Sequence, residues 1–469
     1  MFRADKTRET PVARAARLPV ADSPPPAHPP RRVLAASLVG SIVEWYDLFV
    51  YGSLVVVLSA VFFPRIGNIP PLLPALAAFV AGAAVRPLGG AIFGRLGDRV
   101  GRRFTFLLTI VVMGLGSVAV GLLPTYAEIG IWAPIGLVSL RIIQGLSLGG
   151  EYGGGVIYVA ENAADARRGF WTSLLQASAT LGLLLATGVV LFSRVWLGAA
   201  AFASWGWRLP FLGASVLIVV AVAIRWTLTE TPLYERLQEL RRTSRAPLRE
   251  SLRSRANLRR VLYAMAVVGG ASVVWHTAQF YTPVFLQSSL HLDIATTATI
   301  TLVALALAAP FYLLFGALSD RYGRLRLILL GSVLGAISFY PSFLALTYFS
   351  APPNLPALTL LLFGQLVIAA LCYAPLGAYL VELFPARIRY TSLSIAYGVG
   401  TGDIGDATVV IAPLLAFLLG SIYAGLIWSL VVPLVGVAIA VALFFEQPQE
   451  SIWTEVEPAP PVPALVPGE

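Results

Sequence analysis

Long apolar stretches alternate with short polar segments from residue 33 to residue 446. About twelve of these stretches reach roughly 20 residues, the length at which a helix crosses a bilayer. They are too long for the strands of a membrane barrel, and lipid cannot satisfy an open backbone, so each predicts a membrane helix. The expected helices cover residues 33–63, 72–96, 104–123, 131–160, 169–193, 207–228, 259–287, 296–318, 327–349, 355–382, 390–419 and 422–445. The pattern therefore predicts an all-α membrane protein with twelve transmembrane helices.

Two of the polar segments are nearly the same. Residues 94–103 read GRLGDRVGRR, and residues 316–324, which lie 222 positions further on, read GALSDRYGR. Other side chains recur at almost the same shift of 221: Gln144, Tyr152, Tyr158 and Glu161 return as Gln365, Tyr373, Tyr379 and Glu382. Residues 33–228 and 259–446 are therefore expected to be two copies of a six-helix bundle. Both copies begin on the same side, so they are parallel repeats related by an axis along the membrane normal.

The composition supports this topology. Of 469 residues, 57% are hydrophobic and only 12% are charged, too few charges for a soluble protein of this size. Arginines gather before the first helix, between the two bundles and in the loops on that same side, so both termini are expected in the cytoplasm. The net charge of +9 then reflects topology, and a nucleic-acid partner is not expected.

Three segments lie outside the bundles. Residues 1–32 and 447–469 are polar or proline-rich, and we expect a disordered cytoplasmic leader and a disordered cytoplasmic tail. The linker 229–258 carries leucines at near-helical spacing among many arginines. This pattern fits a basic amphipathic helix on the anionic inner leaflet and a merely solvated linker equally well.

Several longer segments carry a family resemblance. They are residues 40–47 (GSIVEWYD), 86–90 (RPLGG), 141–145 (RIIQG), 149–153 (GGEYG), 205–210 (WGWRLP) and 382–389 (ELFPARIR). Together with the repeated turn they resemble the major facilitator superfamily, and more narrowly its metabolite:proton symporter branch, whose members carry α-ketoglutarate, citrate, shikimate, proline or betaine. The resemblance implies the major facilitator fold, a monomer in the cell (inner) membrane, and a proton gradient as the energy source in place of a cofactor. The substrate does not follow from membership of this branch.

Charged side chains at bilayer depth cost roughly 2.5–3.5 kcal/mol each on insertion scales and are usually functional. The internal repeat separates two kinds of buried charge. Residues present in both halves are expected to be scaffold, and residues present in one half are better candidates for transport. Glu44 and Asp47, for example, align with Val274 and Thr277.

Glu44 and Asp47 lie three residues apart on one helix face, with Tyr51 one turn further. Two carboxylates in a low-dielectric site cannot both ionise cheaply, so one is expected to bind a proton. The alternative is that one of them pairs with an arginine and only holds helices together. Arg86 lies deep in the second helix and needs an anion, either one of these carboxylates or a carboxylate of the substrate.

On the fourth helix, Arg141, Gln144 and Glu151 share a face. Arg141 with Gln144 matches a second superfamily motif that is linked to proton coupling, and the alternative is a purely structural contact. We assign proton coupling to Glu44, Asp47, Arg141 and Glu151. In this half we assign substrate binding to Tyr51, Arg86 and Gln144.

The second bundle supplies the remaining candidates for substrate binding: Trp275, His276, Gln279, Tyr281, Asp403 and Asp406. His276 can relay a proton near neutral pH, or it can donate a hydrogen bond to the substrate. Asp403 and Asp406 depart from the branch, where this segment holds mostly glycine, small and aromatic residues. This acidic pair can bind a cationic group or a second proton, or simply face a water-filled cavity.

The repeated turns predict a gate. Their acidic and basic side chains can form ion pairs with neighbouring helix ends, closing the cytoplasmic side in one state and breaking in the other. The residues assigned to this gate are Asp98, Arg102, Arg103, Glu161, Asp320, Arg324, Glu382 and Arg387. The alternative is that these charges only set the topology.

These expectations converge on a secondary active transporter that moves a small carboxylate-bearing metabolite, either an organic acid or a zwitterionic compatible solute, together with protons. A proton-driven drug or metabolite exporter is the main alternative, and a transporter-like sensor is a weaker one because neither tail forms an output domain. An enzyme is not expected, since no metal cluster, nucleophile with its base or nucleotide loop occurs at usable spacing.

Overall fold

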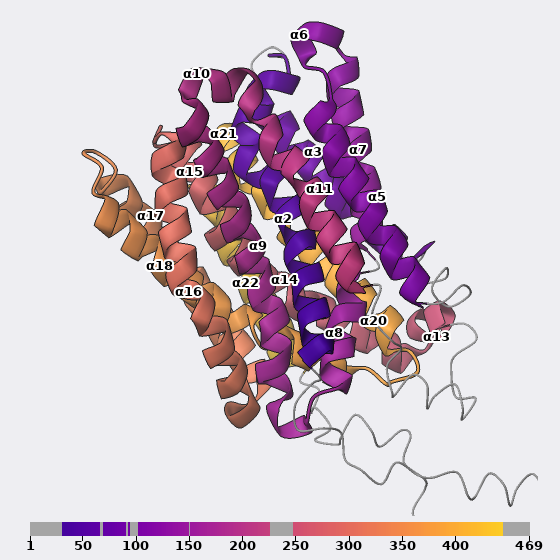
Figure 1. Ribbon diagram of the computed structural model, residues 1–469. Coiled ribbons are helices and arrows are strands. Elements are labelled where there is room, and N and C mark those ends of the chain that lie inside the picture. Colours follow the sequence, from indigo (N-terminus) through magenta and orange to yellow (C-terminus); the bar gives the residue numbers. More distant parts are fainter. Residues whose placement is uncertain are drawn as a thin grey trace, which may run out of the picture.

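The computed structural model describes residues 31–65, 69–90, 92–93, 102–149, 151–225 and 247–443, and these ranges are helical almost throughout (Figure 1). The helices of the first half are α2 (Arg31–Phe62), α3 (Leu72–Ala84), α5 (Arg102–Leu122), α6 (Tyr126–Ile129), α7 (Trp132–Leu148), α8 (Glu151–Glu161), η1 (Asp165–Arg167), α9 (Arg168–Leu197), α10 (Ala199–Ala201), η2 (Phe202–Gly206) and α11 (Arg208–Arg225). Those that follow are α13 (Pro247–Arg253), α14 (Arg255–His276), η3 (Thr277–Tyr281), α15 (Thr282–Ser288), α16 (Ile294–Tyr322), α17 (Arg324–Tyr348), α18 (Leu355–Tyr373), α19 (Leu376–Leu383), α20 (Arg389–Tyr397), η4 (Gly398–Gly405), α21 (Thr408–Leu419) and α22 (Leu426–Ala442).

These helices assemble into membrane-length rods. Among the described residues, nine are long and apolar enough to span a bilayer, and the bent pair Ala199–Gly206 and Arg208–Ile224 makes a tenth. Two shorter apolar helices, Leu108–Leu122 and Leu426–Ala442, occupy the two remaining predicted positions. The spans follow one another as the hydrophobic pattern predicts, which confirms the all-α class. The expected leader and tail and most of the expected linker lie outside the described residues.

Helix ends follow local chemistry. The side chain of Asp293 accepts a hydrogen bond from the backbone nitrogen of Ala295 and caps α16, and Asn354 caps α18 in the same way through Ala357. Gly323, at a φ of 95°, turns the chain sharply between α16 and α17, a conformation that suits glycine. The second copy of the repeated turn is therefore a tight corner between two rods.

The two halves meet along two contacts that the internal repeat relates to each other. We call the packing of α9 against α16 the glycine interface. We call the packing of the Leu72–Gly90 span against η4 and α21 the charged interface. In Figure 1, α9 and α16 run side by side along the length of the molecule.

At the glycine interface the backbones come very close. A Cβ atom on Gly316 would lie 2.7 Å from the carbonyl oxygen of Gly169 and 2.3 Å from the hydroxyl of Ser173. Small residues permit such an approach, and in a membrane van der Waals packing of this kind holds helices together. The same device is used inside the first bundle, where a Cβ on Gly145 would lie 1.8 Å from the carbonyl oxygen of Gly82.

Candidate functional site

The charged interface contains a buried ion pair between the halves. Arg86 comes from the Leu72–Gly90 span, and its guanidinium lies 3.0 Å from the Oδ2 atom of Asp406, which directly follows η4. Nε2 of His276, the last residue of α14, contacts the other carboxylate oxygen, Oδ1. All three side chains are buried, and that of Asp406 is only 1% exposed. One carboxylate therefore bridges a cation of the first bundle and an imidazole of the second.

Local backbone geometry brings these groups together. The segments η3 and η4 are π-helical. Such turns are rare in proteins as a whole, and those that occur are often found at functional sites. The first begins directly after His276, and the second ends directly before Asp406. A Cβ on Gly405 would lie 2.9 Å from the imidazole of His276, so the glycine is needed for this approach.

A second polar cluster lies within the first bundle. The amide nitrogen of Gln144 donates hydrogen bonds to Asp47 at 3.0 Å and to Ser117 at 2.9 Å. The guanidinium of Arg141 donates to the amide oxygen of Gln144 at 3.1 Å and lies over the ring of Tyr51, 4.7 Å from its centroid. The structure thus brings Asp47, Gln144, Arg141 and Tyr51 together, and of these Asp47 and Arg141 have no counterpart in the repeat.

Aromatic rings lie between the two halves near the buried charges. Trp45 and Phe49 of α2 each lie 6.0 Å from Trp275 of α14, measured between ring centroids. Trp275 also stacks on Tyr373 at 4.9 Å, and Phe280 lies 5.0 Å from Phe49. These five residues form what we call the aromatic layer.

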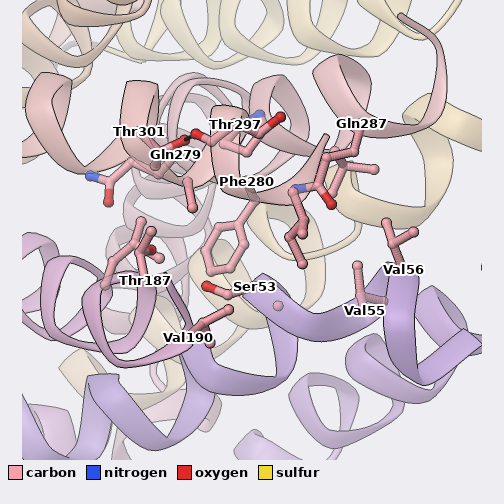
Figure 2. A pocket seen from close by; sticks show the side chains of 16 residues that line it. Ser53, Val55, Val56, Thr187, Val190, Gln279, Phe280, Gln287, Thr297 and Thr301 are labelled. Atoms are coloured by element: carbon pink, nitrogen blue, oxygen red, sulfur yellow. Dashed lines mark hydrogen bonds between the residues drawn. The ribbon is translucent and has the colours of Figure 1, made fainter. Parts of the chain in front are cut away.

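Two small cavities flank this layer, each with a volume of about 30 Å³. The first, shown in Figure 2, has Ser53, Val190 and Thr187 on one side and Gln279 and Thr301 on the other, with Phe280 pointing into it. Such a volume holds water but not a metabolite. In the conformation described here, the first cavity is too small for a substrate.

The second cavity lies on the other side of the layer. It is lined by Glu44 and Arg86, together with Trp45, Gly153 and Ser394, and it is equally small. Glu44 and Arg86 therefore face one space between the bundles, as the sequence allowed.

Gln279 also links the halves. Its amide nitrogen donates to the hydroxyl of Thr180 on α9 at 3.1 Å and to the hydroxyl of Tyr312 on α16 at 2.9 Å. The indole of Trp275 donates to the same Tyr312 hydroxyl at 2.7 Å. The side-chain amide oxygen of Gln279 is buried without a hydrogen-bond partner among the described residues. It can therefore accept a hydrogen bond from a ligand or a water molecule.

At the end that bears the repeated turns, ion pairs join the two halves. We call two of them, Arg168–Glu382 at 3.1 Å and Arg389–Glu161 at 3.2 Å, the gate pairs. They are related by the internal repeat, because both members of the first pair lie 221 positions from their counterparts in the second. We call this end of the molecule the basic end.

The turn of the second half adds to this closure. The carboxylate of Asp320 accepts hydrogen bonds from the backbone nitrogens of Gly169 and Phe170, the first turn of α9, at 2.8 and 3.0 Å. Arg324 contacts both Asp320, at 2.5 Å, and Glu382, at 3.2 Å. The predicted gate residues Asp320, Arg324 and Glu382 therefore lie at one inter-bundle contact, and Glu161 lies at the other gate pair.

Other predicted residues lie elsewhere. Arg387 contacts Glu250, and its side chain is 56% exposed, whereas its neighbour Arg389 takes the buried place between the bundles. Tyr281 stacks on Phe343 inside the second bundle, at 5.6 Å. Asp403 is half-buried, one turn before Asp406. Asp98 lies outside the described residues, as do the side chains of Arg102, Arg103 and Glu151.

The sequence analysis did not predict the partner of Arg86. Glu44, Asp47 and the substrate were the anions considered, but the structure places Asp406 against it. The repeat held a signal that could have found this pair, because the positions aligned with Arg86 and Asp406 are Ala308 and Leu185. Arg168, Tyr312 and Ser117 were not among the assigned residues either.

No group of three metal-ligating side chains occurs in the part of the chain that the structure describes. The site consists of buried ion pairs, aromatic rings and hydroxyls between two helical bundles. Buried charges between two helical bundles of membrane length are typical of membrane transporters.

Comparison with known proteins agrees. The family model described as "Major Facilitator Superfamily" matches residues 49–339 and 282–466, and the chain belongs to this superfamily. Its relatives include the glycine betaine/proline/ectoine/pipecolic acid transporter OusA of Dickeya dadantii, with 34% identity covering 81% of this chain and 77% of the relative. The shikimate transporter of Escherichia coli is 32% identical, covering 81% of this chain and 87% of that protein.

The fold is also similar to solved structures. A structure of the proton:xylose symporter XylE with bound 6-bromo-6-deoxy-D-glucose superposes with a TM-score of 0.70 and 19% identity, covering 88% of this chain and 94% of the symporter. The likeness extends over most of both chains, so the two proteins share a fold.

Proposed function

We propose that this protein is a proton-driven symporter for small metabolites that bear a carboxylate, with zwitterionic compatible solutes as the favoured class. The observation that carries the proposal is Arg86, a buried guanidinium held by a carboxylate between the two bundles. Arginine keeps its charge at every physiological pH, and its planar fork matches a carboxylate. In this proposal Asp406 binds the guanidinium of Arg86 until a substrate carboxylate replaces it.

The aromatic layer supports a zwitterion. Trp45, a member of this layer, lines the second cavity together with Arg86 and Tyr397. Aromatic rings attract methylated or secondary ammonium groups. A molecule with a carboxylate at one end and such a cation at the other fits this order of groups. The relatives support the same class, because glycine betaine, proline, ectoine and shikimate all bear a carboxylate.

The basic end is the cytoplasmic end in this proposal, because arginines accumulate on the cytoplasmic side of membrane proteins. The gate pairs then close the cytoplasmic side in the conformation described here. Alternating access would proceed by rocking one bundle against the other, which breaks these pairs and opens a path to the cytoplasm.

Transport by the purified protein in vesicles tests the proposal. Labelled glycine betaine, proline and shikimate are offered separately, with and without an inward proton gradient. We expect accumulation above equilibrium of at least one of them when the gradient is present, and only equilibration after a protonophore is added. Accumulation that survives the protonophore would rule out proton coupling, and proton flux opposite to the substrate would favour the exporter.

The cluster in the first bundle contributes to coupling in this proposal. Asp47 is buried against Gln144, and a proton on it would neutralise the carboxylate. Asp47→Asn should therefore lose gradient-driven accumulation while retaining exchange of labelled for unlabelled substrate. A variant that still accumulates substrate would restrict Asp47 to a structural role.

A further inference from the structure

Two side chains, Arg86 and His276, share the carboxylate of Asp406 at the charged interface. Asp406 and His276 both belong to the second bundle, and Arg86 belongs to the first. The Arg86–Asp406 contact therefore joins the bundles, whereas the His276–Asp406 contact lies within one of them. A change at the second contact can alter the first without any movement of the first bundle.

The hydrogen bonds of His276 fix where its protons lie. Its Nδ1 atom lies 2.7 Å from the backbone carbonyl oxygen of Ser272, and a carbonyl oxygen can only accept. Nδ1 therefore carries a hydrogen. Nε2 faces Oδ1 of Asp406, so close contact requires one further proton between these two atoms, on either the imidazole or the carboxyl. Without it, two lone pairs would face each other.

We propose that His276 and Asp406 bind the proton that allows a substrate carboxylate to replace Asp406 on Arg86. This inference rests on the proposed function and adds a second coupling site, in the bundle opposite Asp47. When the proton is present, Asp406 remains neutral or paired with imidazolium after Arg86 leaves it. When the proton is absent, the departure of Arg86 would strand a buried carboxylate, which is strongly unfavourable. Proton and substrate therefore bind together.

Other charged and titratable groups also face Asp406. The charged and titratable groups that face it are Arg86, His276, Arg141, Asp403 and Tyr373. Arg141 also faces Asp47, so it lies in the electrostatic field of both carboxylates. Neither Arg86 nor Asp406 has a counterpart in the other half of the repeat, which fits a function that only one interface performs.

The test measures apparent substrate affinity against pH, using whichever of glycine betaine, proline or shikimate the wild-type protein accumulates. If one proton must bind together with the substrate, the apparent affinity changes by up to tenfold per pH unit at pH values where the free protein has lost that proton. For the wild-type protein we therefore expect affinity to fall as the pH rises from 6 to 9.

Two variants should remove this dependence in opposite ways. Asp406→Asn imitates the protonated carboxyl, so its affinity should be independent of pH and close to the wild-type value at acid pH. His276→Gln removes the imidazole that shares the proton with Asp406, so the carboxylate stays ionised and bound to Arg86. The affinity of this variant should be independent of pH and close to the weak wild-type value at alkaline pH. A merely structural pair would lower affinity or folding in both variants and leave the pH dependence intact.

Glu128→Gln is the matched control. It removes an exposed carboxylate outside the site and should retain the wild-type dependence on pH. The inference is overturned if wild-type affinity is itself independent of pH, or if both Asp406→Asn and His276→Gln keep the wild-type dependence. Since gradient-driven accumulation by the wild-type protein tests the proposed function separately, that function can stand while this inference fails. If one variant does not fold, the other decides.

Discussion

The glycine interface and the charged interface occupy equivalent places in the two halves, yet their chemistry differs. The first brings α9 against α16 through Gly169 and Gly316, with backbones almost touching. The second brings the Leu72–Gly90 span against η4 through the Arg86–Asp406 ion pair. The glycine interface is thus a contact of closely packed helices, whereas the charged interface is a contact whose strength depends on charge.

The gate pairs show the opposite behaviour. Arg168–Glu382 joins α9 to α19, and its counterpart Arg389–Glu161 joins α20 to α8, at almost the same distance. The ion pairs at the basic end are therefore duplicated, whereas the buried Arg86–Asp406 pair is not. The comparison teaches that the contacts at the basic end follow the internal repeat, and that the buried charge between the bundles departs from it.

The largest expected effect follows from removing the cation of the charged interface. Arg86→Gln leaves the buried Asp406 without its inter-bundle partner, and losing one member of a buried pair costs about 3–5 kcal/mol. Uptake should fall by at least about 100-fold, since about 1.4 kcal/mol corresponds to a factor of ten. Arg86→Lys should be intermediate, because lysine keeps the charge without the planar fork.

Arg65→Gln provides the control for this prediction, since Arg65 is exposed and lies at the end of α2. It should transport at the wild-type rate. If Arg86→Gln transports as well as Arg65→Gln, the charged interface has no special role.

A smaller effect is expected at the gate pairs. Arg168→Gln and Arg389→Gln each weaken closure of the basic end, and each should raise the labelling rate of a Ser394→Cys reporter by about tenfold. Ser394 lines the second cavity, so labelling requires that end to open. The reporter is built in a Cys372→Ser background, which removes the buried native cysteine.

Arg387→Gln distinguishes the sequence-based gate from the observed one. Arg387 is largely exposed, and surface ion pairs contribute about 0–1 kcal/mol. With Arg387→Gln added, the Ser394→Cys reporter should be labelled at the same rate as the reporter without it. If Arg387→Gln raised the labelling rate as much as Arg389→Gln, Arg387 would also contribute to closing the basic end.

The glycine interface predicts a change in stability. Gly316→Ala places a methyl group 2.3 Å from the Ser173 hydroxyl, so the helices must separate and the thermal unfolding midpoint should fall by several degrees. Gly364→Ala meets nothing within 4 Å and gains up to about 1 kcal/mol of helix propensity, so its midpoint should rise. Equal shifts in both variants would mean that close packing at Gly316 is unimportant.

The smallest effect is expected at Glu128, outside both interfaces. Hydrogen bonds donated by the backbone nitrogen and hydroxyl of Thr125, at 2.6 and 2.9 Å, hold the pKa of Glu128 below its usual range. Because the folded pKa is lowered, the stabilisation is present above the unfolded pKa and is lost as pH falls through the folded value. Glu128→Gln should melt slightly earlier than wild type at neutral pH and identically in acid, with unchanged uptake.

The hydrophobic pattern predicted the spans well because lipid imposes one solution on the backbone. Even the shortest spans, Leu108–Leu122 and Leu426–Ala442, lie where the apolar stretches do. The pairing of charges was harder to predict, since it depends on which helices face each other across the bundles. Arg389 and Arg387 are two residues apart, and only the direction of their side chains decides which is buried.

The same limit applies within the site. The residues Asp406, His276 and Arg86 were each identified as candidates, but the bridge among them was not. It depends on two π-helical turns, η3 and η4, whose sequences carry no simple periodicity. Alignment of the repeat came closest, because it showed which charges stand alone.

The aromatic layer has a consequence for energy conservation. The cavities on its two sides share no lining residue, and each is large enough only for water. Protons cross membranes rapidly along unbroken files of water, and apolar constrictions interrupt such files. The layer separates the cavity at Gln279 from the cavity at Glu44. In a protein driven by a proton gradient, this separation would prevent protons from leaking between the two cavities without substrate.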